Sequence, residues 1–350
     1  MSPSHPNLYI CRSPLQLLNC IEACEKLGQT GGDNILLCAW RAELDRQLMQ
    51  RLLDLYPRWS EVYFFSLYPT KNQIQPMLRI LRRHRHFSKI FVGDTTHLIN
   101  IFLNKLWHFE SIYLIDDGAS TIRRSALIAN RSLHLLRKNG SPRSALSSLM
   151  QDALGLSPMF AYQAQFFTYY EIQHPELADK IVKNDLNFSK SHIREKPRSQ
   201  EVWFIGSDIR QVVLENRDDY CDFLAQVHRK INLSKVVYIP HRKEPDHYLA
   251  KISKRFDMEV RRLDNILELE LIHADALPQA FASFTSSALD TIDILAKSPI
   301  TVFRIPASAI HETARSVYDD VYDAMARKGF DIIELDASSC TSITQQRHET

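Results

Sequence analysis

The chain has 350 residues, of which 45% are hydrophobic, 24% charged and 10% aromatic, a composition typical of a globular protein and not of a disordered or fibrous one. The 43 Lys and Arg residues nearly balance the 41 Asp and Glu residues, so the formal net charge is +2. This balance argues against a whole-molecule electrostatic attraction to nucleic acid, although it is compatible with a local basic patch.

Several sequence features that would point to other protein classes are missing. Neither G-x-G-x-x-G nor G-x-x-x-x-G-K-[ST] occurs, which excludes the two familiar glycine-rich phosphate-binding loops. The six cysteines form no C-x-x-C pair and several lie in apolar runs, as expected for buried thiols in a reducing compartment. The first residues lack the basic start and long apolar centre of a signal peptide, so we expect a cytoplasmic protein.

Short apolar runs alternate with amphipathic segments of helical length along nearly the whole chain. Runs of branched and aromatic residues are typical of strands buried on both faces of a parallel sheet. The strands predicted in the first half are Leu8–Cys11, Ile35–Ala39, Val62–Phe65, Ile90–Val92 and Ile112–Ile115. Between them, Pro14–Leu27 and Ala42–Leu55 each place apolar residues on one stripe, which predicts helices.

The second half repeats this alternation of strands and helices. The strands predicted there are Val202–Ile205, Val236–Ile239, Met258–Val260, Ala280–Phe284, Thr301–Phe303 and Ile332–Leu335. The helices predicted there are Asp218–Ile231, His247–Phe256, Ile266–His273, Ala288–Lys297 and Ala309–Lys328. Residues 139–183 fit neither pattern cleanly; they are aromatic-rich with helical character, and an insertion is one interpretation.

Strand–helix alternation implies right-handed crossovers with helices on both faces of each sheet. The sequence therefore predicts an α/β protein with two doubly wound Rossmann-like domains facing a cleft. We place the first domain at residues 1–185, a linker at 186–200, the second domain at 201–340 and a flexible tail at 341–350.

In open parallel sheets, ligands bind at the carboxyl ends of strands, so the polar residues that follow each apolar run are the candidate site. After Ile112–Ile115 come Asp116, Asp117 and Gly118. A carboxylate at this position is suited to act as a general base on a hydroxyl, and the alternative interpretation is an acidic helix start.

The second half has its own polar strand ends. His241, Arg242 and Lys243 follow Val236–Ile239 and form a cationic cluster suited to phosphate, the alternative being a solvated basic turn. Ser286 and Ser287 lie just before a predicted helix, where hydroxyls and free amides either cap the helix or bind an anion.

Two further segments of the second half are candidate nucleotide contacts. Gly206 and Ser207 form a sharp turn at which backbone can approach a nucleotide closely. Glu268 and Glu270 lie at the start of a predicted helix and can accept hydrogen bonds from ribose hydroxyls, although a solvated helix face is the default for such residues.

With these motifs in place, the sequence resembles the bacterial sialyltransferases of the GT-B glycosyltransferase fold, the group that includes lipooligosaccharide sialyltransferases and capsular polysialyltransferases. Asp116-Asp117-Gly118 is similar to the acidic-acidic-Gly motif of that group, Tyr238-Ile239-Pro240-His241 to its His-Pro motif, and Thr285-Ser286-Ser287 to its Ser/Thr-rich motif. The opening Cys11–Asn19 is similar to the first strand-turn-helix of the lipooligosaccharide branch, which makes Ser13 and Gln16 candidate substrate contacts.

The resemblance implies an inverting transfer of sialic acid, or a related nonulosonic acid, from a CMP-activated donor to a hydroxyl of a cell-surface glycan such as lipooligosaccharide or capsule. Asp117 or Asp116 would be the base, and His241 with Ser286 and Ser287 would stabilise the leaving phosphate. Glu268 or Glu270 would contact the ribose or the cytosine, and backbone near Gly206 the cytosine edge. The sequence does not distinguish between the two aspartates.

The resemblance also implies that protein donors, and neither a metal ion nor an organic cofactor, take the phosphate charge. Arg242 stands where much of the group has proline, so the turn there is expected to differ and Arg242 to add a second phosphate contact. The alternatives are a transferase for CMP-Kdo, CMP-pseudaminic acid or CMP-legionaminic acid, or a non-catalytic α/β protein that binds polyanions. The oligomeric state is open.

The most basic segment runs from Arg79 to Lys89. A solvated helix face is the ordinary interpretation of such a run. The functional interpretation is a peripheral contact with the anionic inner-membrane surface or with an acidic acceptor, to which Arg123 and Arg124 would add.

Overall fold

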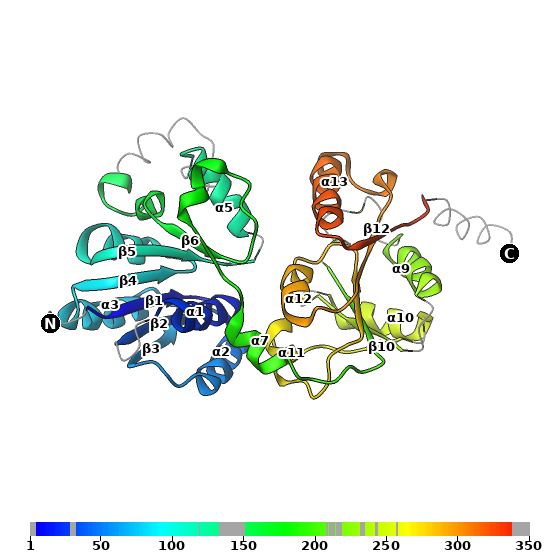
Figure 1. Cartoon of the computed structure of the whole chain (residues 1–350), viewed down its shortest axis with the longest axis horizontal. Helices are drawn as coiled ribbons and strands as arrows, with labels where there is room; N and C mark the ends of the chain where they lie inside the picture. The colour runs from blue at the N-terminus through cyan, green and yellow to red at the C-terminus, as the bar shows by residue number, and fades with distance from the viewer. Residues whose placement is uncertain are drawn as a thin grey trace. The chain divides into compact units, whose positions relative to one another are not determined.

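The computed structural model describes residues 5–28, 33–118, 120–132, 151–207, 209, 214, 219–231, 235–241, 244–256 and 258–337. The chain divides into two compact units, Met1–Ser191 and His192–Thr350. Each unit is a parallel sheet with helices packed on it (Figure 1). The expected tail at 341–350 lies outside the described residues.

The first unit is built on a seven-stranded sheet in the order β3-β2-β1-β4-β5-β6-β7, with every neighbouring pair parallel. The strands are β1 (Asn7–Cys11), β2 (Asn34–Trp40), β3 (Glu61–Ser66), β4 (His86–Val92), β5 (His108–Ile115), β6 (Gln165–Thr168) and β7 (Ile181–Lys183). The five strands predicted in the first half are confirmed. β6 and β7 were not predicted, because each is only three or four residues long and begins or ends with a polar side chain.

Capping residues mark the start of the first helix of the first unit. Helix α1 begins after Ser13, whose hydroxyl accepts a hydrogen bond from the Gln16 backbone N–H at 3.3 Å, and Pro14 occupies its first turn without losing a backbone bond. The other helical segments are α2 (Glu43–Leu55), α3 (Lys71–Arg83), α4 (His97–Ile101), a π-helix (Phe102–Leu106), α5 (Ser120–Ala129), 3-10 turns (Met159–Tyr162 and Pro175–Lys180) and α7 (Asn187–Ile193); α1 itself spans Pro14–Leu27.

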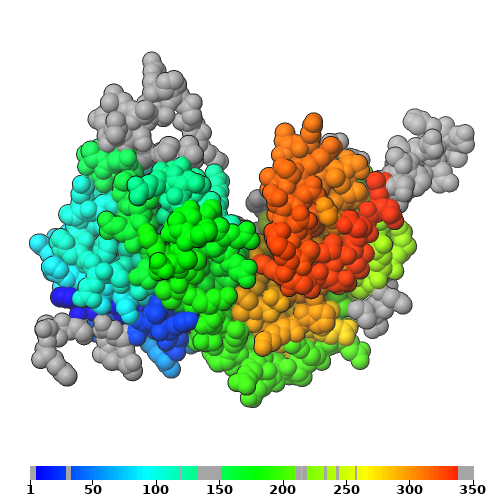
Figure 2. All heavy atoms as spheres, turned by 45° about the horizontal axis from the view of Figure 1, so that its top comes forward, coloured from blue at the N-terminus to red at the C-terminus, as the bar shows by residue number. Residues whose placement is uncertain are grey.

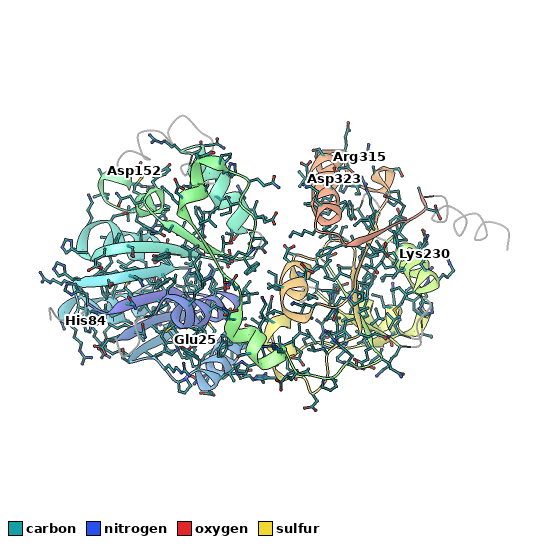
Figure 3. The ribbon with its side chains drawn as sticks, in the orientation of Figure 1. Glu25, His84, Asp152, Lys230, Arg315 and Asp323 are labelled. Carbon is teal, nitrogen blue, oxygen red and sulfur yellow. The ribbon has the colours of Figure 1, made fainter. Side chains whose placement is uncertain are left out.

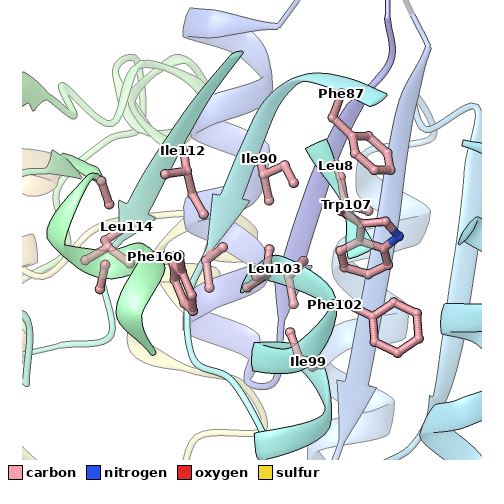
Figure 4. Packing of buried hydrophobic residues seen from close by; sticks show 14 of the residues in the cluster. Leu8, Phe87, Ile90, Ile99, Phe102, Leu103, Trp107, Ile112, Leu114 and Phe160 are labelled. Atoms are coloured by element: carbon pink, nitrogen blue, oxygen red, sulfur yellow. The ribbon is translucent and has the colours of Figure 1, made fainter. Parts of the chain in front are cut away.

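The core of the first unit lies between the sheet and the helices that cover it. Figure 4 shows Ile99 of α4 and Phe102 and Leu103 of the following turn packed on the same face of the sheet as Leu8 and Ile90. All five are at most 4% exposed, and burial on this scale is the main term that stabilises the unit.

The segment predicted as a linker is partly a helix. α7 begins inside it, and the backbone N–H groups of Phe188 and Ser189 donate to the buried carboxylate of Glu22 in α1 at 2.9 and 2.8 Å. Burial raises the pKa of Glu22, while these hydrogen bonds lower it. The start of the predicted linker is therefore attached to the first unit.

The second unit is a six-stranded parallel sheet in the order β10-β9-β8-β11-β12-β13. The strands are β8 (Val202–Ile205), β9 (Val236–Ile239), β10 (Glu259–Val260), β11 (Ala280–Ser283), β12 (Ile300–Arg304) and β13 (Asp331–Glu334). The helical segments are α9 (Asp219–Lys230), α10 (Asp246–Phe256), α11 (Leu267–His273), α12 (Ala288–Ala296), a 3-10 turn (Ala307–Ala309) and α13 (Glu312–Arg327). All six predicted strands are confirmed to within two residues at either end. Figure 2 shows α13 lying at the surface of this unit.

The strand orders fix where a ligand can approach each sheet. In the first unit, β1 lies between β2 and β4, and in the second unit β8 lies between β9 and β11. The chain order of the strands reverses direction at β1 and at β8, so the carboxyl ends of β1 and β4, and of β8 and β11, flank the two topological switch points at which doubly wound sheets bind ligands. The residues that follow these four strands are therefore the first to consider as a site.

Two other sequence expectations can be compared with the structure. Cys11, Cys20, Cys24 and Cys38 are buried free thiols, as expected, whereas Cys221 is only partly buried and Cys340 lies outside the described residues. In the part of the chain that the structure describes, every helix is too short or too polar to cross a membrane.

Candidate active site

The two adjacent aspartates after β5 have different environments. Asp116 is fully buried, and its two carboxylate oxygens accept hydrogen bonds from the Thr168 hydroxyl at 2.6 Å and from the Tyr169 backbone N–H at 2.9 Å. Both partners follow or end β6, the strand that the sequence did not predict. Burial raises the pKa of Asp116 to about 7, even though these hydrogen bonds lower it. Asp116 thus ties the end of β5 to the end of β6 and has no oxygen exposed to a substrate.

Asp117 is half-buried and lies at the turn into α5. Its backbone N–H donates to the Thr121 hydroxyl at 3.0 Å, and the Ser120 hydroxyl donates to its carbonyl at 2.6 Å and approaches its carboxylate at 3.3 Å. Gly118 follows with a φ of +62°, a left-handed conformation that glycine adopts without strain. Of the two aspartates, Asp117 is the one whose carboxylate a substrate hydroxyl can reach.

Three arginines and a third aspartate lie at the same edge of the sheet, and the sequence analysis assigned none of them to the site. Arg12 follows β1 and forms an ion pair with Asp94, which follows β4. Arg41 follows β2 and approaches the same Asp94 carboxylate at 3.5 Å. Arg124 of α5 donates to the Gly93 carbonyl at 2.6 Å. The expectation that Arg124 extends a basic outer surface is therefore wrong, because its guanidinium turns inward to the end of β4.

A cue for these residues was present in the sequence. Arg12, Arg41 and Asp94 each follow an apolar run within two residues, as Asp116 does. The same rule that singled out the aspartates after β5 would have found them, had it been applied to every strand of the first half. Arg124 could not be found in this way, because it lies inside a helix.

Ser13 and Gln16, the two candidates at the start of α1, are used within the protein. Ser13 caps the helix, and the Gln16 side-chain oxygen accepts from the Arg12 backbone N–H at 2.8 Å. A Cβ added at Gly93 would lie 2.5 Å from that same Gln16 oxygen, so the end of β4 must pass close to Gln16. Gln16 is 2% exposed and therefore holds the turn that carries Arg12.

In the second unit, His241 follows β9 at a turn organised by a buried glutamate. The Glu244 carboxylate accepts from the His241 backbone N–H at 2.7 Å and from the Tyr238 hydroxyl at 2.8 Å. The hydroxyls of Tyr238 and Tyr220 lie 2.8 Å apart, and burial raises the pKa of both phenols, so they stay neutral. The imidazole of His241 is half-buried at this turn.

Gly206 and Ser207 lie beside that turn, as the neighbouring ends of β8 and β9 require. A Cβ on Gly206 would lie 2.7 Å from a carboxylate oxygen of Glu244 and 3.0 Å from the backbone nitrogen of His241, so the turn packs against bare backbone. The hydroxyl of Ser207 is buried and has no hydrogen-bond partner among the described residues. An unsatisfied buried hydroxyl at a switch point is a group that a ligand can satisfy.

Ser286 and Ser287 lie at the end of β11, on the other side of β8. The buried Ser283 hydroxyl donates to the Ile205 carbonyl at 2.7 Å and accepts from the Ser286 backbone N–H at 3.1 Å, which fixes the turn against β8. Ser286 is half-buried, and its hydroxyl accepts from the Ala288 backbone N–H at 3.3 Å; Ser287 is exposed, and its side chain does not cap α12.

The two candidate glutamates lie on α11 in different settings. Glu268 is buried, accepts from the Thr291 hydroxyl of α12 at 2.6 Å, and has its pKa raised by burial. Glu270 is half-buried, and its carboxylate accepts from the Asn265 side-chain amide at 2.8 Å. Glu268 therefore connects α11 to the first turns of α12, the helix that Ser286 and Ser287 precede.

The structure thus gathers the predicted residues into two sets, one on each unit. Asp116, Asp117, Ser13 and Gln16 lie at the carboxyl edge of the seven-stranded sheet, while Gly206, Ser207, His241, Ser286, Ser287 and the α11 glutamates belong to the carboxyl edge of the six-stranded one. Arg242 lies outside the described residues. Among the residues that the structure does describe, His, Cys, Asp and Glu side chains nowhere gather in a group that could hold a metal ion.

Comparison with known structures defines the fold. The UDP-GlcNAc 2-epimerase of Neisseria meningitidis bound to UDP-GlcNAc aligns with a TM-score of 0.54 at 12% identity over 98% of this chain and 91% of its own. A sialyltransferase from Photobacterium damsela aligns with a TM-score of 0.50 at 15% identity over 96% and 82%. MnaA of S. aureus with UDP aligns with a TM-score of 0.50 at 10% identity over 99% and 88%. A sequence search of curated proteins found no match.

Two parallel α/β units, with polar residues at both switch points and these structural neighbours, define a protein of the GT-B type. The model of glycosyltransferase family 52 matches residues 46–295, which include Asp116, Asp117, His241 and Ser286. The chain belongs to glycosyltransferase family 52, and the protein is a glycosyltransferase.

Proposed function

We propose that the protein transfers sialic acid, or a related nonulosonic acid, from its CMP-activated form to a hydroxyl of a cell-surface glycan such as lipooligosaccharide or capsule, with inversion at the anomeric carbon. The observation that carries this proposal is the accessible Asp117 carboxylate beside the buried Asp116, at the switch-point edge of a family 52 sheet. The sialyltransferase among the structural neighbours has the same fold and is compatible with the proposal.

In the proposed reaction, the oxygen of the acceptor hydroxyl forms a bond to the anomeric carbon of the donor sugar. Asp117 accepts the proton of that hydroxyl as the bond forms. The bond from that carbon to the CMP phosphate oxygen breaks, and its electron pair leaves on the phosphate. His241 donates a proton or a hydrogen bond to that oxygen, with the Ser286 and Ser287 hydroxyls as further donors. Protein groups alone neutralise the leaving phosphate in this scheme.

Asp116 has a different role in the proposal. Because its side chain is fully buried and held by residues of the β6 end, a substrate hydroxyl cannot reach it. It acts as a positioning residue that holds the β5 end, and so Asp117, against β6. Glu268 or Glu270 accepts from the ribose hydroxyls; the half-buried Glu270 is the more accessible of the two. Backbone groups near Gly206 contact the edge of the cytosine base.

The experiment that tests the donor class is nucleotide binding followed by transfer. CMP should raise the melting temperature of the full chain, and UMP, AMP and GMP should raise it less at equal concentration. Transfer is then measured with CMP-sialic acid, CMP-Kdo, CMP-pseudaminic acid and CMP-legionaminic acid, in the presence and absence of EDTA. We expect transfer from CMP-sialic acid that EDTA leaves unchanged.

The other outcomes each correct a specific part of the proposal. Transfer from another of these CMP-sugars alone would change the donor sugar and leave the mechanism. A larger shift with UMP would assign the protein to a different donor class, and a strict metal requirement would replace the phosphate chemistry. No shift with any nucleotide would favour a non-catalytic polyanion-binding protein.

We further propose that the basic segment Arg79–Lys89 binds the anionic surface of the inner membrane. Arg79, Arg82 and Arg85 are exposed and make no ion pair with any described residue, and Ile74 and Leu78 of α3 are 43% and 38% exposed. Exposed cations next to exposed apolar side chains on one helix are typical of an interfacial contact.

Not all of the segment is available for this contact. Arg83 pairs with Glu61 at 3.1 Å, and the Lys89 ammonium donates to the Leu27 carbonyl at 2.7 Å. His84, which ends α3 at the periphery of the first unit (Figure 3), pairs with Glu61 at 3.2 Å. The contact is therefore assigned to Arg79, Arg82 and Arg85.

Liposome flotation at low salt tests this surface. The native chain should float with phosphatidylglycerol vesicles and not with phosphatidylcholine vesicles, and the triple change of Arg79, Arg82 and Arg85 to Gln should abolish flotation. The control removes three exposed lysines of the second unit, Lys230, Lys251 and Lys254. Equal flotation of the two triple variants, or none of the native chain, would refute the membrane contact.

A further inference from the structure

Three arginines converge on one turn at the switch point of the first unit, which we call the arginine cluster: Arg12, Arg41 and Arg124. They come from the ends of β1 and β2 and from α5, and all three lie close to Gly93 and Asp94 at the end of β4. Burial lowers the pKa of both Arg12 and Arg124, and the charge of the proposed base, Asp117, opposes this effect at each guanidinium group. The cluster and the base therefore share one edge of the sheet.

Arg12 is buried, and its guanidinium is only partly satisfied by hydrogen bonds within the described residues. Its side chain is only 8% exposed, and of its five N–H donors it uses those of Nη2 on Asp94. Its Nε is buried and has no hydrogen-bond partner among the described residues. Leaving a buried charged donor unsatisfied is energetically unfavourable, so such a group is suited to donating a hydrogen bond to a ligand.

The charges of the cluster are not balanced. Three guanidinium groups face the carboxylates of Asp94 and Asp117 and the buried carboxyl of Asp116, and burial raises the pKa of Asp116 to about 7, so that it is partly protonated at neutral pH. Burial and the positive charge of Arg41 lower the pKa of Arg12 to about 10, the direction expected when cations are crowded. The excess is at most one positive charge.

The carboxylates at the start of α2 do not compensate for this excess. Glu43 pairs with Arg46 at 2.6 Å, and Asp45 accepts from the Ala42 backbone N–H at 3.3 Å. Both are therefore used within α2 and its start. Arg41 is 52% exposed and, among the described residues, contacts only the Asp94 carboxylate, at 3.5 Å, so its guanidinium is accessible to a ligand.

We propose that the arginine cluster is a subsite for a carboxylate of the transferred or accepting sugar. A planar guanidinium matches a carboxylate with two parallel hydrogen bonds, and an excess of at most one positive charge suits a singly charged group better than a phosphate. This inference rests on the proposed function, because only there does a carboxylate-bearing sugar reach the edge that carries Asp117.

Two sugars can supply that carboxylate. A nonulosonic acid donor carries a carboxylate on its anomeric carbon. This carbon is the atom attacked by the acceptor oxygen, which Asp117 deprotonates. An acidic acceptor carries one on its terminal residue. The chemistry at the arginines is the same in both cases, so the sources are separated by the probes.

The experiment measures binding by calorimetry with the full chain and two matched pairs of probes. The donor pair is CMP-N-acetylneuraminate and its C1 carboxamide. The acceptor pair is 3′-sialyllactose and its C1 carboxamide, each with and without CMP. The preference for the carboxylate over its neutral counterpart should be about 10- to 100-fold in one pair, as a charge-assisted bidentate contact predicts.

Two variants test the residues. Arg41→Gln changes a half-exposed side chain and should spare the fold, and Arg12→Lys keeps the charge while removing the planar fork. Both should lose most of the carboxylate preference without weakening the binding of CMP itself. Arg46→Gln, which removes an exposed arginine paired with Glu43 on α2, is the control and should keep the preference.

The outcomes separate this subsite from the proposed function. Loss of preference in the donor pair or in the acceptor pair assigns the carboxylate to that sugar. An Arg41→Gln variant that keeps the full preference in both pairs, or a native chain that shows none, overturns the subsite even if CMP binds. A chain that binds 3′-sialyllactose over its C1 carboxamide but does not bind CMP keeps the subsite and loses the CMP-dependent function.

Discussion

The two sheet edges that carry the candidate residues, one in each unit, occupy the same position in their folds and differ in chemistry. At the β1–β4 edge of the first unit, charged side chains face one another: Arg12 against Asp94, with Asp117 and Arg124 close by. At the β8–β11 edge of the second unit, hydroxyls, bare backbone at Gly206 and one imidazole take their place. The fold fixes where a ligand meets the protein, and the residues after the strands decide whether that edge moves a proton or holds a phosphate.

The largest effect is expected from the charged edge. Asp117→Asn removes the only aspartate of the pair that a substrate can reach, so turnover should fall by about 10²- to 10⁴-fold, as for a lost general base. CMP binding should be unchanged, since the nucleotide is assigned to the second unit. Steady-state kinetics with the CMP-sugar donor provide the measurement, and Asp54→Asn on the exposed face of α2 is the control. Retained turnover would remove Asp117 from the mechanism.

A comparable effect is expected at the edge of the second unit. His241→Ala removes the proposed donor to the leaving phosphate, and turnover should fall by roughly two to four orders of magnitude. His228→Ala, an exposed histidine of α9, serves as the control. CMP binding distinguishes the two variants. His241→Ala should weaken CMP binding as well as turnover, whereas Asp117→Asn should lower turnover alone. Full activity in this variant would leave the phosphate without its assigned donor.

A smaller effect is expected at the residue that organises the histidine turn. Glu244→Ala leaves the His241 N–H and the Tyr238 hydroxyl without their acceptor, which should cost about 1–3 kcal/mol of unfolding free energy and lower turnover. Glu244→Gln can still accept from His241 with its oxygen and donate to Tyr238 with its amide. Urea unfolding and kinetics should therefore rank the native chain, Gln and Ala in that order, and equal losses in Gln and Ala would mean that the negative charge, not the hydrogen bonds, holds the turn.

The smallest effect is a pH dependence of stability that comes from Asp116. Its folded-state pKa of about 7 lies above its ordinary value, so between about pH 4 and 7 the folded chain binds a proton that the unfolded chain has released. The contribution of Asp116 to stability is therefore highest at low pH and is lost as pH rises toward 7. Asp116→Asn keeps a neutral side chain throughout and should flatten this fall.

Thermal unfolding at pH 5 and pH 8 measures this difference. The melting temperature of Asp116→Asn relative to the native chain should rise by a few degrees between the two pH values. A constant difference would show that the buried carboxyl titrates normally. Turnover of this variant should fall far less than that of Asp117→Asn, and equal losses would contradict the separate roles of the two aspartates.

Much of the fold could be read from local sequence. The apolar runs that form β1, β2, β8 and β9 predict strands because a strand buried on both faces must be continuously apolar. The edge strands β3, β10 and β13 are only partly buried, and their branched and aromatic residues identify them. β6 was missed since four residues, QFFT, are too few for a pattern to distinguish a strand from an aromatic turn. Without β6, the hydrogen-bond partners of Asp116 could not be identified, because they lie at the end of that strand. The sequence therefore did not distinguish Asp116 from Asp117.

The amino-acid sequence by itself determined the two-unit α/β architecture, the order of its motifs and the residue types available at each strand end, because periodicity and strand-end polarity are local properties of the chain. Only the tertiary structure decided which aspartate is buried and which arginines face Asp94. The hydrogen bonds to Asp116 come from residues 52 and 53 positions away, and the partner of Arg12 is 82 positions away. Burial and charge pairing depend on such distant neighbours, which no local window of sequence contains.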